Sequence, residues 1–228
     1  MTDVFDRDTI EDLKKIDTPT LCNAIESVKG KPYINDFLGM DIRCLLPDLG
    51  VMVGFAVTAT VDSTTPDVPP DPSVWIDCLK AVQASPKPAV LVFKDVGSQV
   101  RKSAHLGEVM GTTANRLGAI GVITDGGVRD ILELKRLGFH CFAAGLCPSH
   151  GNPRIVQANL PVVIDGVLIN PGDLLHADAN GVAKVPLELV EQVIAAAEDV
   201  YQDEAELMNY VRSGNFNLAG LRRRQLKH

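Results

Sequence analysis

The sequence lacks the features that mark membrane-spanning, secreted and disulfide-rich proteins. No uninterrupted apolar stretch approaches the roughly 18 residues of a membrane-spanning helix. The chain begins Met-Thr-Asp-Val-Phe-Asp, without the basic and then apolar layout of a signal peptide. Its five cysteines are odd in number and form no Cys-x-x-Cys pair, so a disulfide framework is not expected. We therefore expect a cytoplasmic protein with reduced thiols and no membrane partner.

Basic residues are in the minority. Lysine and arginine number 22 against 29 aspartates and glutamates, which gives a net charge of −7. Nucleic-acid binding requires clustered positive charge that neutralises phosphates, so no nucleic-acid partner is expected. The one basic cluster, Arg222-Arg223-Arg224 with Lys227, is a short run near the end of the chain. Such a run is typical of a solvated tail.

The length and apolar content fit one globular domain. The chain has 228 residues, of which 46% are hydrophobic, enough to form a full core. We predict a single domain over residues 1–228. Its parts are N-terminal helices at 8–29, a βαβ region at 88–144, a hairpin region at 154–185 and a C-terminal helix at about 187–212.

The N-terminal third alternates helical and extended patterns. Thr18-Pro19 breaks the first helical region in two, and Thr20 is placed to cap the second helix. Residues 51–61 are predicted to form a strand, and residues 74–83 a helix before the next prolines.

The central region predicts two successive parallel βαβ units. Apolar runs at 88–93, 119–124 and 139–144 indicate buried strands, and residues 108–117 have helical spacing. Gly126-Gly127 is interpreted as a turn that tolerates positive φ, followed by a helix whose first turn contains Arg129 and Asp130. Parallel strands open a ligand crevice at their carboxyl ends, so Glu108, Arg129 and Asp130 are expected to meet there.

The C-terminal third contains hairpin signals. Asp165-Gly166 separates two short apolar runs, and Asn180-Gly181 marks another turn. The order of helices, parallel units, hairpins and a final helix predicts an α/β fold, layered as an α/β/β/α sandwich.

The residue types at the expected crevice suit a metal ion and an anionic substrate. Free N–H groups at the start of the 108–117 helix favour a carboxylate or phosphate. Arg129 offers a planar fork for a carboxylate. Asp130 offers hard oxygen to Mg²⁺ or Mn²⁺, and Glu108 can hold such an ion through water.

The spacing of these residues resembles the RraA-like family. Twenty residues separate Glu108 from the Arg129-Asp130 pair. The resemblance continues through residues 167–173 and 177–182 and covers roughly residues 10 to 215. The family includes 4-hydroxy-4-methyl-2-oxoglutarate aldolases and the regulator of ribonuclease E activity A. It implies the swivelling β/β/α type of fold and a homotrimer or homohexamer.

The resemblance also implies a role for each residue of the motif. Asp130 would coordinate the metal directly and Glu108 would orient its waters. Arg129 would bind the keto acid and steady the enolate. Beside Gly107, the amides of Val109 and Met110 would take the substrate carboxylate.

A further metal contact through water is implied to come from the C-terminal helix of a neighbouring subunit. The position of this helix relative to Gly214 indicates that the contributed residue is Glu204. Relatives are expected to have a lysine at the position of Asp203, and this difference weakens the placement at Glu204. Glu206 therefore stays an alternative.

These features predict a class II, metal-dependent pyruvate aldolase or oxaloacetate decarboxylase. It would release pyruvate from a 4-hydroxy-2-oxo acid by retro-aldol cleavage, or decarboxylate oxaloacetate, through a metal-stabilised enolate. The alternative is a non-catalytic regulator that binds a ribonuclease or another protein. A methyltransferase is not indicated, because no glycine-rich strand-loop-helix precedes a ribose-binding acid.

Other polar residues admit two interpretations. His105 could act as an acid or base, but a surface or packing role is favoured. Lys94 could form a Schiff base, but a strand-end lysine that reaches solvent is favoured. His140-Cys141 with Cys147 and His150 lacks the paired spacing of structural zinc ligands.

Two segments are individual to this chain. Residues 63–73 are rich in proline and aspartate, and residues 145–154 contain a Cys-Pro-Ser-His-Gly run. Both are candidates for the walls of the substrate pocket.

Overall fold

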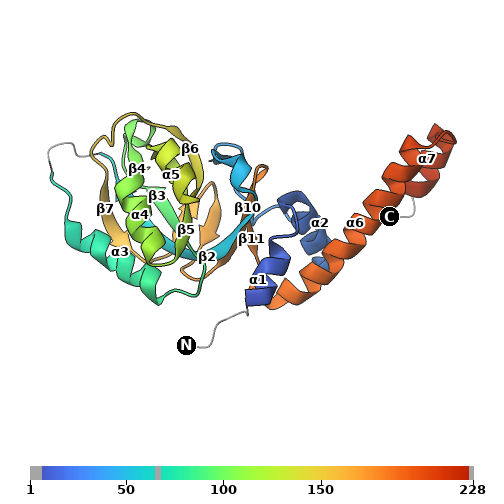
Figure 1. Ribbon diagram of the computed structural model, residues 1–228, viewed down its shortest axis with the longest axis horizontal. Coiled ribbons are helices and arrows are strands. Elements are labelled where there is room, and N and C mark those ends of the chain that lie inside the picture. The colour runs from blue at the N-terminus through green and yellow to red at the C-terminus, as the bar shows by residue number, and fades with distance from the viewer. Residues whose placement is uncertain (1–6, 65–67, 226–228) are drawn as a thin grey trace.

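A nine-stranded mixed sheet organises the fold (Figure 1). The computed structural model describes residues 7–64 and 68–225. The order of the principal strands is β1-β6-β5-β3-β2-β10-β11, with β4 paired to β5 and β7 paired to β2. The strands are β1 (Arg43–Cys44), β2 (Met52–Asp62), β3 (Ala89–Asp95), β4 (Ala104–Leu106), β5 (Ala119–Val128), β6 (His140–Leu146), β7 (Arg154–Ala158), β10 (Leu174–Asp178) and β11 (Gly181–Val185).

The middle of the sheet is parallel. Strand β3 lies between β2 and β5, and β6 follows β5, all in the same direction. The crossovers contain α3 (Pro72–Ala84), α4 (Glu108–Arg116) and α5 (Ile131–Leu137). The predicted strands and helices of this region are confirmed, with ends that move by a few residues. These parallel strands place the starts of α4 and α5 at one edge of the sheet.

The predicted turn at Gly126-Gly127 is wrong. Both glycines lie inside β5, where Gly127 pairs with Ala104 of β4 and with Gly145 of β6. A Cβ at Gly126 would collide with the imidazole of His105. These glycines therefore provide close strand packing, and the chain turns later, at Asp130, which has φ 55°.

Arg129 and Asp130 also lie outside the helix that was predicted to contain them. Helix α5 begins at Ile131, and Asp130 is its N-cap. The longer β5 carries the strand up to Val128, so both polar residues fall in the short connection between strand and helix.

Two N-terminal helices form where they were predicted, α1 (Arg7–Leu13) and α2 (Thr18–Lys29). The cap of α2 is Asp17 rather than Thr20. The Asp17 carboxylate accepts hydrogen bonds from the Thr20 amide at 3.0 Å and from the Thr20 hydroxyl at 2.9 Å. An aspartate just before the first turn can accept the free amides there, whereas Thr20 already lies within that turn.

A separate hairpin covers one face of the sheet. Strands β8 (Val162–Ile164) and β9 (Val167–Ile169) are antiparallel. Asp165 and Gly166 join them with φ of 51° and 80°, as the predicted tight turn requires. The inward side chains of the hairpin pack with Met52, Val90, Ile123 and Phe142 of the large sheet.

Helices cover the opposite face. Helices α3, α4 and α5 enclose a core with Leu91, Phe93 and Val122, while α1, α2 and the first part of α6 pack around Phe55 and Leu174. Helices, sheet and hairpin thus stack in layers, with parallel units before hairpins. The predicted α/β fold class is confirmed.

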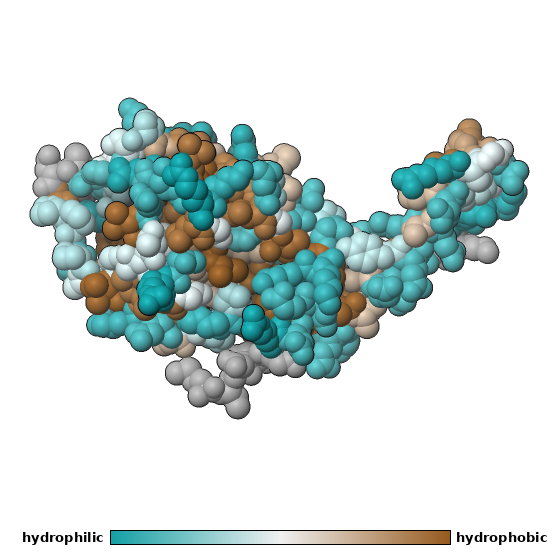
Figure 2. Space-filling view, viewed as in Figure 1, coloured by the Kyte–Doolittle hydropathy of each residue, from teal (hydrophilic) through white to brown (hydrophobic). Residues whose placement is uncertain are grey.

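The C-terminal helices form an arm that projects from the body (Figure 1). After the 3₁₀ turn Leu187–Leu189, α6 runs over Val190–Arg212, and α7 spans Leu218–Gln225. Arg224 lies over the Tyr210 ring at 3.9 Å, so the arginine run belongs to a packed helix rather than to a free tail. Figure 2 shows hydrophobic side chains on the visible face of the body and a mostly hydrophilic arm.

None of the helices in the described ranges has the length and apolar character needed to cross a membrane. All five cysteines are free, as expected.

Three histidines are buried inside the fold: His105, His140 and His176. His176 on β10 contacts the Thr18 hydroxyl at 3.0 Å and the Leu13 carbonyl at 3.1 Å, which ties α1 and α2 to the sheet. Burial lowers the pKa of His176. Burial, with a smaller effect of the Lys14 charge, lowers the pKa of His140 to about 4.

Acid should therefore destabilise the protein. When folding lowers the pKa of a histidine, the unfolded chain takes up the proton at a higher pH than the folded protein does. The contribution of that histidine to stability is therefore fully present above the pKa of the unfolded state and is lost as the pH falls. For His140 alone we expect the free energy of unfolding to fall by about 2 kcal/mol between pH 7 and pH 5. Urea unfolding of His140→Leu should show a flatter pH dependence. Exposed His150→Gln serves as the control, and an equal pH dependence in wild type and His140→Leu would contradict the assignment.

Candidate active site

A pocket of about 440 Å³ opens beside the start of α4. Four residues of the predicted motif line it: Gly107, Val109, Met110 and Arg129. Asp130 lies directly behind Gly107. The structure therefore brings the two halves of the motif together, although twenty residues of sequence separate them.

Asp130 connects the beginnings of two helices. As the N-cap of α5 it adopts a left-handed backbone, yet its side chain makes no hydrogen bond to that helix. Its Oδ2 instead accepts from the Glu108 amide at 2.9 Å and lies 3.5 Å from the Arg129 Nε. The positive φ turns the carboxylate of one helix onto the first amide of the other.

Gly107 is needed because a side chain would not fit at this position, not because of its backbone conformation. Its φ of −138° is open to any residue. A Cβ at this position would lie 2.5 Å from the Asp130 Oδ2 and 2.9 Å from the Arg129 Nε. The absence of a side chain at residue 107 thus lets the guanidinium and the carboxylate approach the start of α4.

The first turn of α4 offers free donors. The first bond within the helix runs from the Gly111 amide to the Gly107 carbonyl. Asp130 occupies the Glu108 amide, and within the described ranges the amides of Val109 and Met110 have no acceptor. Two amides at the positive end of a helix form a place for a carboxylate group.

The side chains of the other predicted acidic residues, Glu108, Glu204 and Glu206, do not line the pocket. The Glu108 side chain is exposed, and only its backbone contacts Asp130. Glu204 and Glu206 are exposed on α6, in the arm that stands away from α4 and α5 (Figure 1). Among the residues that the structure describes, no three histidine, cysteine or acidic side chains cluster as metal ligands.

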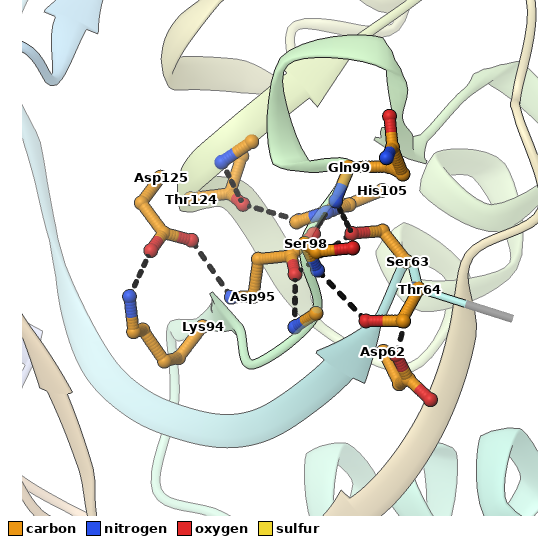
Figure 3. A network of polar contacts seen from close by, with 12 residues as sticks. Asp62, Ser63, Thr64, Lys94, Asp95, Ser98, Gln99, His105, Thr124 and Asp125 are labelled. Atoms are coloured by element: carbon orange, nitrogen blue, oxygen red, sulfur yellow. Dashed lines mark hydrogen bonds and ion pairs between the residues drawn. The ribbon is translucent and has the colours of Figure 1, made fainter.

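His105 belongs to a buried hydrogen-bond network (Figure 3). It is 2% exposed, its Nε2 lies 2.9 Å from the Asp95 Oδ2, and its Nδ1 lies 2.7 Å from the Thr124 hydroxyl. A carboxylate only accepts, so we assign the ring proton to Nε2. Because both ring nitrogens are engaged, the favoured packing role agrees with the geometry, although the ring borders the pocket.

Asp95 is the centre of this network. It also accepts from the Ser63 hydroxyl at 2.9 Å and from the Gly97 amide at 2.6 Å. Burial alone would raise the pKa of Asp95, but the hydrogen bonds from His105, Gly97 and Ser63 hold it below its usual value. The network fixes β3 to β4 and β5 just before the motif. No spacing in the sequence indicates it, because its members come from separate segments.

Lys94 lies at a second, more polar cavity of about 480 Å³ on the other side of β5. It forms an ion pair with Asp125 and is one-third exposed, so it does not simply reach solvent. The Asp125 carboxylate also accepts from the Asp95 amide at 2.8 Å. The ion pair holds the Lys94 amine against Asp125 rather than presenting it as a free nucleophile for Schiff-base formation.

The possible zinc ligands are dispersed. His140 and Cys141 are adjacent in β6, so their side chains point to opposite faces of the sheet. Cys141 packs in the helix-side core. Cys147 borders the second cavity and His150 the first.

The two individual segments do line the pocket. Pro70, Asp71 and Pro72 contribute from the first, and His150, Asn152 and Pro153 from the second. The Asn152 side chain donates to the Val68 carbonyl at 3.1 Å and so connects them. Residues 65–67 lie outside the described ranges.

Four further lining residues were not expected from the sequence: Val61 of β2, Trp75 of α3, Ala104 of β4 and Ile155 of β7. The signal for Trp75 was its rarity, since it is the only tryptophan in the chain.

Comparison with known proteins gives consistent matches. A family model described as "RraA-like: Aldolase/RraA" matches residues 11–183. An uncharacterized protein of Methanocaldococcus jannaschii is 27% identical over 89% of this chain and 88% of its own. A Halalkalibacterium halodurans protein named "Putative 4-hydroxy-4-methyl-2-oxoglutarate aldolase" is 33% identical over 55% of this chain and 60% of its own.

A solved structure supports the same relationship. Streptomyces coelicolor RraAS2, described as an unusual member of the RNase ES inhibitor RraA protein family, superposes with a TM-score of 0.69. The two chains are 25% identical, and the match covers 90% of this chain and 98% of that one.

Replacing His105 with alanine should destabilise the fold. The change leaves the Asp95 carboxylate buried without its imidazole donor, and the expected loss is about 3 kcal/mol of unfolding free energy. Urea denaturation followed by circular dichroism measures this loss. The matched control is His150→Ala, an exposed histidine whose removal should change stability by less than about 0.5 kcal/mol. Equal midpoints for both variants would refute the proposed importance of the network.

Proposed function

The chain belongs to the RraA-like family, and from this premise we propose that it is a divalent-metal-dependent lyase. The proposed reaction releases pyruvate from a 4-hydroxy-2-oxo acid by retro-aldol cleavage, or decarboxylates oxaloacetate. The observation that carries the proposal is the convergence of the Arg129 guanidinium with the free amides of Val109 and Met110 at one pocket. An arginine beside two helix amides provides the donors that a 2-oxo carboxylate needs.

The residues present fit Mg²⁺ or Mn²⁺. Both contacts of the Asp130 carboxylate fall on Oδ2, which leaves Oδ1 for a cation within the described part of the chain. Mg²⁺ prefers oxygen and keeps several of its waters, so one direct carboxylate is sufficient. Asp130 would hold the ion directly, and Glu108 would contact its waters. When bound, the ion would withdraw electrons from the 2-oxo group.

Arg129 would bind the substrate and balance charge. Its guanidinium lies between the Asp130 carboxylate and the pocket, and the ion pair with Asp130 fixes its orientation. Both reactions leave negative charge on the pyruvate portion of the substrate when the carbon–carbon bond breaks. A preoriented guanidinium stabilises that charge without having to reorganise.

The contacts of the described side chains identify none of them as the acceptor for the proton of the C4 hydroxyl. His105 borders the pocket, but both of its ring nitrogens are engaged. We therefore assign this proton to a water molecule in the pocket.

An assembly would complete the site. Glu204 stands on the projecting arm, where it is too remote to serve its own chain. We propose a homotrimer or homohexamer in which Glu204 of a neighbouring copy contributes a contact through water.

A regulatory role is the second candidate. It is favoured by the likeness to Streptomyces RraAS2 over 90% of this chain, because that protein is described as a member of an RNase inhibitor family. A purified protein that binds a ribonuclease and releases no pyruvate would support this role instead.

Arg129→Ala should remove activity and leave the fold intact. Loss of the guanidinium should reduce kcat/KM by at least about 10²-fold, and EDTA should abolish the wild-type activity. Pyruvate release is measured with lactate dehydrogenase, from oxaloacetate and from 4-hydroxy-2-oxo acids. Arg116→Ala, an exposed arginine at the end of α4, is the control. Near-normal turnover by Arg129→Ala, or full activity in EDTA, would exclude this mechanism.

Gly107→Ala tests the spacing of the site. The added methyl group collides with the Asp130 carboxylate and the Arg129 guanidinium, so both should move and kcat/KM should fall by about 10²-fold. The same assay applies, with circular dichroism to verify folding. Gly145→Ala is the matched control, because nothing lies within 4 Å of a Cβ at that strand glycine. The spacing argument fails if the two alanine variants are equally active.

A further inference from the structure

We infer that, among 4-hydroxy-2-oxo acids and their analogues, the pocket selects those with an apolar far end and discriminates against those with a second carboxylate there. This inference rests on the proposed function, because it takes Arg129 and the α4 amides as the site of the first carboxylate. It concerns the remainder of the substrate, which must extend along the rest of the pocket.

The wall beyond the motif is apolar. It is formed by Val61 of β2, Trp75 of α3, Ile155 of β7 and the prolines Pro72 and Pro153. Trp75 and Ile155 are partly buried and pack against the helix-side core, so their positions are fixed from behind. A rigid aromatic and aliphatic wall gains free energy from an apolar group and offers a carboxylate no charged partner; its one side-chain donor is the Trp75 indole N–H.

The charges along the pocket oppose a second anion. Among the described residues that line it, the basic side chains are Arg129, His105 and His150. Both ring nitrogens of His105 are engaged by Asp95 and Thr124, and His150 lies on an exposed loop. Asp71 adds a negative charge to the wall, since hydrogen bonds from Ser73 lower the pKa of its carboxyl. Arg154, which adjoins Pro153 and Ile155 in sequence, forms an ion pair with Asp62.

A dicarboxylate would therefore lose hydration at its far end and meet a like charge there. A substrate with an alkyl end would replace water against Trp75 and its neighbours. Contacts of this kind commonly discriminate by about 10- to 200-fold.

Trp75 makes the inference directly measurable. It is the only tryptophan of the chain, so intrinsic fluorescence reports on this pocket alone. The full-length protein with Mg²⁺ is titrated with 4-methyl-2-oxopentanoate and with 2-oxoglutarate, neither of which carries the C4 hydroxyl needed for cleavage. We expect the Kd of the alkyl acid to be at least about tenfold lower. Equal affinities, or tighter binding of 2-oxoglutarate, would overturn the inference.

Two matched variants test the contribution of charge. Asp71→Asn keeps a residue that can cap α3 and removes the negative charge from the wall. It should tighten 2-oxoglutarate binding several-fold and leave 4-methyl-2-oxopentanoate unchanged. Asp77→Asn, on the same helix and paired with Lys80 in solvent, should change neither. If wild type and both variants bind the two acids alike, selection by this wall is refuted.

A turnover experiment separates this inference from the proposed function. Pyruvate release is compared for 4-hydroxy-2-oxo acids that end in an alkyl group or in a carboxylate. Faster cleavage of the alkyl substrates supports both ideas. Release mainly from the dicarboxylate keeps the lyase and overturns the selectivity. If no substrate is cleaved while the fluorescence preference persists, the lyase fails and the selectivity of the pocket stands.

Discussion

The hydrogen bond from the Glu108 amide to the Asp130 carboxylate is the constraint on which the site depends. It joins the starts of two crossover helices that follow neighbouring parallel strands, and it exists only because Gly107 leaves room for it. With the Glu108 amide occupied, the next two amides of α4 remain for a ligand. The same carboxylate orients Arg129, so one acidic residue sets the geometry of both the donors and the guanidinium.

Much of the fold could be predicted from the sequence because its elements are locally encoded. The apolar strands at 88–93 and 119–124 and the turn at Asp165-Gly166 carry their own signals. The motif was also recognisable, since its two halves have fixed spacing. Gly126-Gly127 was misinterpreted because glycine serves both turns and close packing, and only the position of the His105 ring decides between them. The Asp95 network was not predictable, since its residues meet only in the folded sheet.

The buried network around Asp95 supports the strands that position the motif. Asp95, His105 and Thr124 fix the strands that lead into the site, and His105 and Thr124 lie a few residues before Gly107 and Arg129 of the motif (Figure 3). Such interior polar contacts are fully hydrogen-bonded, so they define strand register without exposing charge to the pocket. Described residues of the two individual segments, Pro70, Asp71 and Pro72 from one and His150, Asn152 and Pro153 from the other, then form part of the pocket wall.

The left-handed backbone at Asp130 also bears on how such a protein can change over evolution. Asparagine tolerates this conformation nearly as well as aspartate does, and its amide oxygen can still accept from the Glu108 amide, so the architecture can survive the loss of the negative charge. Such a replacement would keep the shape of the site and remove the charge that is proposed to hold the metal ion. If the proposed function holds, an enzyme and a purely binding descendant can stand one codon apart on the same scaffold.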